Sequence, residues 1–241
     1  MCIRDRCFAE YCAETGIELP RANFTIRYET NIPRQVGMGG SSAIVTAVMR
    51  ALMAFFGVHI PDQMLPNVVL RAETRELGLT AGLQDRVAQS YGGLVYMDFD
   101  VDLMAQNGYG RYERLDYASL PPLYIAYRKD LSQESSTAHI RVREMYEMGD
   151  RKVVETMGEI AALADQARQA LLDGRPGDLP AILDRNFDLR AEIYPISEAN
   201  LDMVRRARST GAACKFCGSG GAVVGMYEDC LLYTSDAADE L

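Results

Sequence analysis

The chain has 241 residues, of which 48% are hydrophobic and 24% are charged, enough to bury a core in one large or two smaller domains. No apolar run is long enough to cross a membrane, so we expect no membrane partner. The net charge of -9 argues against nucleic acid as a partner, because it repels a phosphate polyanion overall. Small anions remain possible ligands, since backbone N–H groups can bind phosphate within an acidic protein.

The cysteines predict no metal centre or disulfide framework. Cys214 and Cys217 form a Cys-x-x-Cys pair, but there is no second pair, and the chain has only two histidines to complete a zinc site. We interpret the six cysteines as structural or incidental and the protein as cytoplasmic.

Both ends of the chain look foreign to the rest. Residues 1–6 lack the apolar region of a signal peptide, and residues 230–241 continue no structural pattern. Both strings resemble translated sequencing-adapter read-through, so we interpret them as non-native ends of an internal fragment of a longer gene. Natural frayed termini are the alternative.

In the first half of the chain, apolar spacing and glycine punctuation predict the elements. They are a helix over 7–15 ending at Gly16, a half-buried strand on Phe24, Ile26 and Tyr28, a loop over 31–40, a helix from Ser41 to Gly57, a helix from Asp62 or Pro66 to Leu77 closed by Gly78, a loop with a short helix over 81–93, and strands over 94–99 and 111–115.

Pro121-Pro122 predicts a domain junction. Beyond it we expect a buried strand over 123–127, helices over 140–148, 152–172, 180–193 and 197–208, and a strand over 222–227. Strands and helices are mixed without regular alternation, so the predicted fold class is α+β.

The strongest chemical signal is the segment from Pro33 to Ala43, here called the phosphate loop. A glycine-rich loop that enters an amphipathic helix exposes backbone N–H groups at the positive end of the helix dipole. Ser41 and Ser42 can cap this helix, or one hydroxyl can bind Mg²⁺. No lysine precedes the serines, so this is not a Walker A loop. An ordinary strand–turn–helix is the alternative.

Three further segments carry candidate chemistry. Asp85 lies in Gly82-Leu83-Gln84-Asp85-Arg86, ahead of Gly92-Gly93, where an isolated aspartate is otherwise a turn or cap residue. Glu73 lies twelve residues earlier on a charged helical face that would normally be solvated surface, with Glu76 as a competing candidate. Gly218-Ser219-Gly220-Gly221 enters an apolar strand and could be a plain hairpin.

Together these segments resemble the signatures of the GHMP kinases, in family order, over about residues 8–228. The phosphate loop is similar to the second signature, with Met38 where leucine is common and an additional glycine, Gly40. The resemblance implies that this loop wraps the phosphates of ATP. The implied nucleotide-binding residues are Pro33, Gly37, Gly39, Gly40, Ser41, Ser42 and Ala43.

The resemblance also implies roles for the other segments. Asp85 would orient or deprotonate the attacking hydroxyl, and Ser42 and Glu73 would hold Mg²⁺. The loop at Gly218, Ser219, Gly220 and Gly221 is similar to the third signature, which packs against the phosphate loop and binds nucleotide. Lys215 would either add charge near the phosphates or be an exposed strand-edge lysine.

Within the family, the segments around Arg34 and Arg86 look most like glucuronokinases, which phosphorylate the anomeric hydroxyl of a sugar acid. The segment from Ser135 to His139, with Arg143, is also similar to that group. Arg34 or Arg86 would pair with the sugar carboxylate, unless both arginines are structural. Heptose-phosphate or other sugar-1-kinases are an alternative, and a catalytically inactive homologue is another.

The resemblance implies a ribosomal-protein-S5-like N-terminal domain and a ferredoxin-like α/β C-terminal domain. We assign residues 7–118 to the nucleotide-binding domain and 119–229 to the C-terminal domain. No segment before Cys7 matches the first family signature, which helps to build the substrate pocket. We therefore expect an N-terminal domain truncated at its start, in a fragment that lacks activity or stable folding.

Overall fold

The computed structural model describes residues 3–76, 78, 81–129 and 135–227, which form two compact units. The first unit comprises Met1–Ile32 and Gly39–Tyr117, and the second comprises Pro33–Met38 and Ala118–Leu241. The expected junction at Pro121-Pro122 lies close to this division. The roles that we assigned to residues 7–118 and 119–229 remain predictions.

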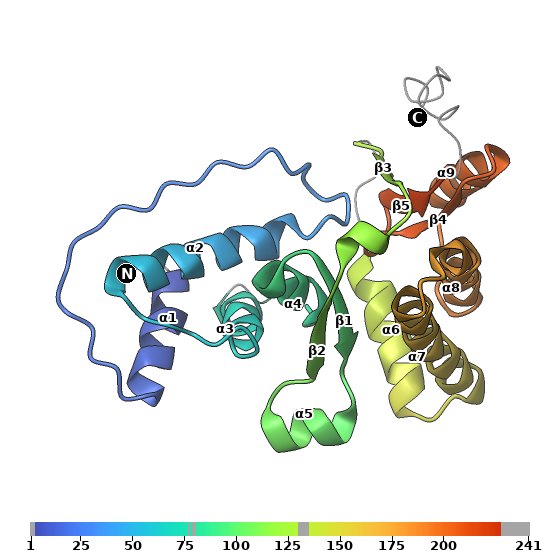
Figure 1. Cartoon of the computed structure of the whole chain (residues 1–241). Helices are drawn as coiled ribbons and strands as arrows, with labels where there is room; N and C mark the ends of the chain where they lie inside the picture. The colour runs from blue at the N-terminus through green and yellow to red at the C-terminus, as the bar shows by residue number, and fades with distance from the viewer. Residues whose placement is uncertain (1–2, 77, 79–80, 130–134, 228–241) are drawn as a thin grey trace. The chain divides into compact units, whose positions relative to one another are not determined.

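The first unit is mainly helical (Figure 1). Its elements are α1 (Ile3–Glu14), α2 (Gly40–Phe56), α3 (Leu65–Arg71), a π-helical turn (Ala72–Glu76), α4 (Gln84–Tyr91), β1 (Leu94–Asp98), α5 (Val101–Asn107) and β2 (Arg111–Leu115). The helices predicted in this unit are confirmed, apart from shifts at their ends. The two strands predicted over 94–99 and 111–115 are also confirmed. A 3₁₀ turn at Tyr117–Ser119 follows β2.

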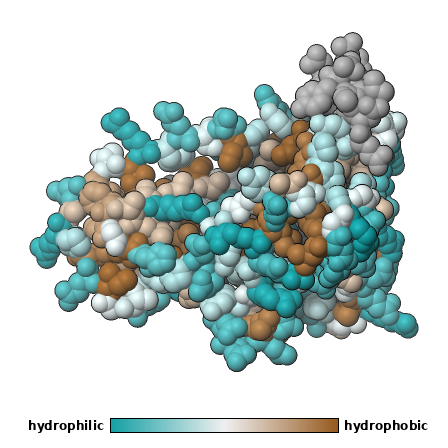
Figure 2. All heavy atoms as spheres, in the orientation of Figure 1, coloured by the Kyte–Doolittle hydropathy of each residue, from teal (hydrophilic) through white to brown (hydrophobic). Residues whose placement is uncertain are grey.

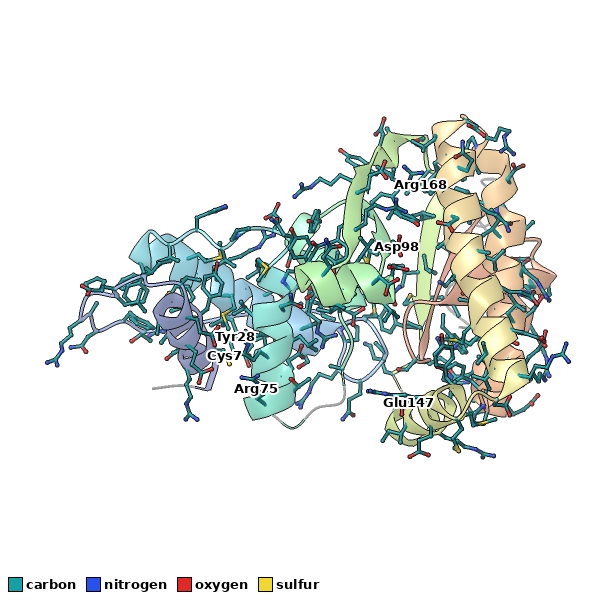
Figure 3. All side chains as sticks on the ribbon, turned by 90° about the horizontal axis from the view of Figure 1, so that it is seen from below. Cys7, Tyr28, Arg75, Asp98, Glu147 and Arg168 are labelled. Atoms are coloured by element: carbon teal, nitrogen blue, oxygen red, sulfur yellow. The ribbon has the colours of Figure 1, made fainter. Side chains whose placement is uncertain are left out.

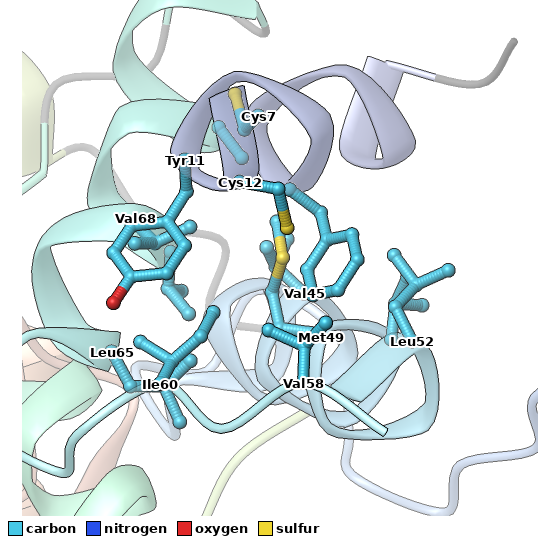
Figure 4. Close-up of a cluster of buried hydrophobic side chains, with 14 residues drawn as sticks. Cys7, Tyr11, Cys12, Val45, Met49, Leu52, Val58, Ile60, Leu65 and Val68 are labelled. Carbon is cyan, nitrogen blue, oxygen red and sulfur yellow. The ribbon is translucent and has the colours of Figure 1, made fainter. Parts of the chain in front are cut away.

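The core of the first unit lies among α1, α2 and α3 (Figure 4). Val45, Val48, Met49 and Leu52 are all at most 4% exposed, and their spacing of three and four residues puts them on one face of α2. The helix ends at Gly57, whose φ of 66° is the left-handed conformation that glycine adopts without strain. The glycine punctuation of this helix is therefore confirmed.

The strand expected at Phe24, Ile26 and Tyr28 is wrong, because the segment between α1 and α2 forms no strand. Phe24 instead packs against the rings of Phe55 and Phe56, with centroids 5.2 and 5.7 Å away. Tyr28, labelled in Figure 3, is 53% exposed. In the described part of this unit the sheet is the β1–β2 hairpin, in which Leu94 faces Leu115, and it offers this segment no partner.

Helix α5 was not expected from the sequence. It connects β1 to β2 and begins at the N-cap Asp100, whose carboxylate accepts hydrogen bonds from the N–H groups of Asp102 and Leu103. Gly108 ends it with a φ of 76°. Aspartate before the helix and glycine after it are the signals that would have revealed it.

The second unit packs helices on a three-stranded sheet. Its elements are β3 (Leu123–Tyr127), α6 (Ser135–Glu147), α7 (Arg151–Leu172), a 3₁₀ turn (Pro176–Asp178), α8 (Leu179–Ile193), α9 (Glu198–Ser209), β4 (Ala213–Phe216) and β5 (Ala222–Met226). The strand order is β3-β5-β4, and both pairings are antiparallel. The helices expected here are confirmed.

Two expectations for this sheet need correction. Strand β3 was expected to be buried, but Leu123, Ile125 and Tyr127 are exposed, because the helices cover only the other face of the strand, which carries Tyr124 and Ala126. Strand β4 was not predicted, although its residues belong to the core. Phe216 and Val223 from the sheet pack with Phe187 of α8 and Val204 of α9.

The visible surface in Figure 2 carries polar side chains over most of its area, with apolar side chains scattered between them. Among the residues that the structure describes, no helix is both long and apolar enough to span a bilayer.

Candidate phosphate-binding and catalytic site

The phosphate loop enters α2 through Gly39, which is the N-cap residue and has a φ of 64°. Of the two alternatives for Ser41 and Ser42, the helix cap is wrong, because no side chain caps this helix start in the described chain. The buried Ser42 hydroxyl donates to the Gly39 carbonyl oxygen at 2.9 Å instead, and Ala43 N–H donates to the same oxygen. The first N–H groups of α2 therefore have no side-chain acceptor, as an anion site requires.

Asp85 lies close to this helix start, within the same unit. A side-chain carbon built at Gly39 would lie 3.3 Å from Asp85 Oδ2 and 3.1 Å from Gln89 Nε2. Gly39 is thus required for both its backbone conformation and the space above it. The Asp85 side chain is 49% exposed, so it can reach a ligand in solvent.

Gln89 connects α4 to α2 and was not assigned a role from the sequence. Its Nε2 donates to Ser42 Oγ at 2.9 Å and to the Gly39 carbonyl at 3.1 Å, while its Oε1 accepts from Thr46 Oγ1 at 3.1 Å. Arg50 also donates to the carbonyl of Gln89. The sequence gives only a weak indication of this role. Gln89 lies one helical turn after Asp85, and an amide side chain at such a position would ordinarily lie on the surface.

Glu73 is fully buried in the π-helical turn and is paired with Arg86 of α4. Arg86 Nε donates to Glu73 Oε2 at 2.7 Å, and Arg86 Nη1 donates to the Gly82 carbonyl at 2.8 Å. Glu73 Oε1 is buried and has no hydrogen-bond partner among the described residues. Glu73 is therefore no solvated surface residue, and the side chain of its rival Glu76 lies outside the described residues.

The two arginines expected to recognise a sugar carboxylate have different environments. Arg86 is 7% exposed and holds Glu73, whereas Arg34 is exposed. The segment from Ser135 to His139 forms the start of α6, but its side chains lie outside the described part of the chain. The assignments of Arg34 and Arg86 to substrate remain predictions.

The loop from Gly218 to Gly221 joins the antiparallel strands β4 and β5, and its assignment to nucleotide remains a prediction. A side-chain carbon at Gly218 would lie 2.6 Å from the Gly37 carbonyl oxygen, which brings this loop against the phosphate loop within the second unit. Asn200 fixes the loop, since its Oδ1 accepts from Gly221 N–H at 2.9 Å. Ser219 is partly exposed.

The Cys-x-x-Cys pair lies within and just after β4 and is not disulfide-bonded. Burial raises the pKa of the Cys214 thiol to about 11, and burial also raises the pKa of Cys217. Metal binding and thiol exchange require the thiolate, which neither group forms readily at neutral pH. Among the described residues, no group of three or more His, Cys, Asp or Glu side chains could hold a metal ion.

Residues 4–93 match the model of the GHMP kinases N terminal domain. Over 90% of the chain, the sequence is 46% identical to glucuronokinase 1 of Arabidopsis thaliana, of which it covers 61%. It is 48% identical to probable glucuronokinase 2 of the same plant over 90% of the chain, covering 60% of that protein. The chain thus spans about three-fifths of the length of these relatives.

More distant proteins share the fold. A crystal structure of a protein from Listeria innocua has a TM-score of 0.77 at 16% identity, covering 96% of this chain and 72% of that one. L. major mevalonate kinase in complex with R-mevalonate has a TM-score of 0.67 at 18% identity, covering 99% of this chain and 71% of that one. Residues 4–93 therefore form a GHMP kinase N-terminal domain, and the chain has the α+β fold of these solved structures.

Proposed function

We propose that this chain forms part of an ATP-dependent kinase that phosphorylates the anomeric hydroxyl of a sugar acid such as glucuronate. The observation that carries the proposal is the placement of the half-exposed Asp85 carboxylate over Gly39, beside the uncapped start of α2. The identity of 46–48% to two proteins named as glucuronokinases supports the substrate class.

The chemical role of Asp85 follows from its position. Its carboxylate would accept the proton of the sugar hydroxyl as that oxygen attacks the γ-phosphate in line. Phosphoryl transfer passes through a loose transition state, so the nucleophile gains more from orientation than from a strong base. The contact with Gly39 puts Asp85 next to the N–H groups that would hold the phosphates.

The phosphates would be held by the backbone of Gly37, Gly39 and Gly40 and by the first turn of α2, which contains Ser41, Ser42 and Ala43. Gln89 would keep this turn in register with Asp85 through its bonds to Ser42 and Gly39. The roles of Pro33 and of the loop at Gly218, Ser219, Gly220 and Gly221 are inferred from the family. The contact of Gly218 with Gly37 supports the loop assignment.

A magnesium ion would be held by Ser42 and Glu73. The donor set fits, because Glu73 Oε1 is a buried acceptor with no partner in the described part of the chain and Mg²⁺ needs few protein ligands. When bound, this ion neutralises charge on the phosphates. Arg86 already binds Glu73 Oε2, so it would fix the orientation of this carboxylate.

We assign the sugar carboxylate to Arg34, because its side chain is exposed while Arg86 is buried against Glu73. Arginine suits this task because its guanidinium can pair with a carboxylate in bidentate fashion. We further propose a cytoplasmic location, which is consistent with the free cysteines. Residues 7–118 would form the nucleotide-binding domain and 119–229 the C-terminal domain.

The proposal is tested by measuring ADP release with ATP, Mg²⁺ and a panel of acceptors. We expect turnover with glucuronate, and little with its neutral analogue glucose. Preference for a heptose phosphate would instead favour the activity named in a Campylobacter jejuni relative that is 24% identical over 68% of this chain and is itself 48% covered. ATP binding without turnover on any acceptor would favour an inactive homologue.

A further inference from the structure

Helix α4 carries Asp85 in its first turn but has only eight residues, from Gln84 to Tyr91. A helix this short is marginal in water by itself, so its neighbours must fix its position. The carbonyl oxygens of Gln89, Ser90 and Tyr91 lie at its C-terminal end, where no later turn of the helix supplies a donor. The placement of Asp85 therefore depends on what holds this end.

Arginine side chains bind all three of these carbonyls. Arg50 of α2 donates from Nη2 to the oxygens of Gln89 at 3.1 Å and Ser90 at 2.8 Å. Arg114 of β2 donates to the Tyr91 oxygen at 3.1 Å, and its guanidinium lies 4.6 Å from the centroid of the Tyr91 ring. Both positive charges lie where the peptide dipoles of the helix leave partial negative charge, so both contacts are favourable.

The two arginines anchor α4 to different elements. Arg50 follows Ser42 and Thr46 at intervals of four residues, so these three side chains form one stripe on the face of α2 that meets α4. Ser42 and Thr46 bind the side-chain amide of Gln89. In the described chain, the side-chain hydrogen bonds from α2 to the main chain of α4 come from Arg50. Arg114 instead ties α4 to the β1–β2 hairpin.

Bonds to the main chain restrict a helix more strictly than bonds to a side chain. The Gln89 amide can follow a small shift of α4 by rotating its side-chain bonds. Two successive carbonyls held by one guanidinium nitrogen fix both the distance and the rotation of the helix end. Asp85 lies one turn before Gln89, so this restraint extends to the carboxylate over Gly39.

We propose that Arg50 is a positioning residue for phosphoryl transfer, which holds the main chain of α4 against α2 and so keeps Asp85 over Gly39. The inference rests on the proposed kinase function. Arg50 lies about 12 Å along α2 from Ser42, at about 1.5 Å per residue, so it acts through α4 and not on the phosphates. A shift of α4 by about 1 Å would misalign the carboxylate with the attacking hydroxyl, and errors of this size cost up to about 100-fold in rate.

Steady-state ADP release from ATP and glucuronate tests this role. Arg50→Met should lower kcat by about tenfold, while the dissociation constant for ATP changes less than about twofold, because the N–H groups at the start of α2 are untouched. Arg50→Lys should recover part of the loss, since its ammonium group can donate to one of the two carbonyls.

Arg114→Met is the matched control. It removes the other arginine at the same helix end but leaves the bonds from α2 intact, so kcat should stay within about twofold of the unaltered protein. An equal loss of kcat in Arg114→Met and Arg50→Met would overturn the inference, because any weakening of α4 would then suffice.

A double-mutant cycle shows whether Arg50 acts through Asp85. In the Asp85→Asn protein the carboxylate is already absent, so adding Arg50→Met should lower kcat by less than about twofold more. A loss of about tenfold in both backgrounds would mean that Arg50 acts independently of Asp85, and the inference would be wrong.

Hydrogen exchange gives a readout that needs no turnover. The amides of residues 84–91 should exchange at least about tenfold faster in Arg50→Met than in the unaltered protein, because the helix end opens more readily. Arg27→Met, at an exposed position between α1 and α2, should leave their exchange unchanged. Absence of turnover with every acceptor would remove the kinase proposal, whereas unchanged exchange of α4 in Arg50→Met would remove this inference.

Discussion

Asp85 and Gln89 are one turn apart on α4, and both approach Gly39 from the same side. The first could be found from the sequence, because an isolated aspartate before paired glycines is part of a family signature. The second could not, because its hydrogen bonds are to Ser42 and Thr46, more than 40 residues away in the sequence. A glutamine four residues after an aspartate indicates no contact partner until the fold brings α4 next to α2.

Asp85→Asn should lower kcat by at least about 100-fold while the dissociation constant for ATP changes less than threefold. Asparagine keeps the shape of the side chain but cannot accept the proton of the sugar hydroxyl. The measurements are steady-state ADP release and nucleotide titration. Asp102→Asn, at an exposed position of α5, is the control. Retention of normal kcat in Asp85→Asn would remove this residue from the chemistry.

Gln89→Leu should destabilise the protein by about 1–3 kcal/mol, because it removes the acceptor of the buried Thr46 hydroxyl and the amide that donates to Ser42 Oγ. Since Gln89 positions the start of α2, the dissociation constant for ATP should also rise. Denaturant unfolding and nucleotide titration measure the two effects. Gln106→Leu on the exposed face of α5 should change neither. Unchanged ATP affinity in a folded Gln89→Leu variant would contradict the positioning role.

At the scale of elements, the Glu73–Arg86 pair joins the π-helical turn to α4. Sequence spacing indicated Glu73 through its distance from Asp85, but Arg86 was assigned to substrate because its pairing was not foreseeable. Most helices were predictable because glycine and proline mark their ends. The strand at Phe24 was wrong because apolar alternation does not itself specify a strand partner, and here the Phe24 ring packs against Phe55 and Phe56 of α2 instead.

Arg86→Met should destabilise the protein by about 3–5 kcal/mol, because it leaves the Glu73 carboxylate buried without a countercharge. Arg71→Met is the matched control, since Arg71 pairs with the more exposed Glu14 and should contribute less than about 1 kcal/mol. Urea unfolding of both variants makes the comparison. Equal losses of unfolding free energy in the two variants would mean that the buried Glu73–Arg86 pair stabilises the protein no more than the Arg71–Glu14 pair does.

Gly218→Ala tests the contact between the glycine loop and the phosphate loop. The added carbon would lie 2.6 Å from the Gly37 carbonyl oxygen, so one loop must move. We expect weaker ATP binding, by about tenfold, and a lower Tm. Gly177→Ala, where an added carbon has nothing within 4 Å, should behave like the unaltered protein. A Gly218→Ala variant with normal ATP affinity would show that this contact is dispensable.

For the whole molecule, the sequence predicted an α+β chain with two parts, and the chain has the GHMP kinase fold in two units. Apolar patterning settles such coarse features because each unit must bury its own core. The chain covers about three-fifths of the length of its plant relatives.

The most direct test of the central claim is the structure of the product formed from glucuronate, ATP and Mg²⁺, read by phosphorus and proton NMR. We predict a single new phosphate ester on the anomeric carbon, shown by phosphorus coupling to the anomeric proton, and its absence with Asp85→Asn. A phosphate on any other hydroxyl, or equal product formation by Asp85→Asn, would contradict the account.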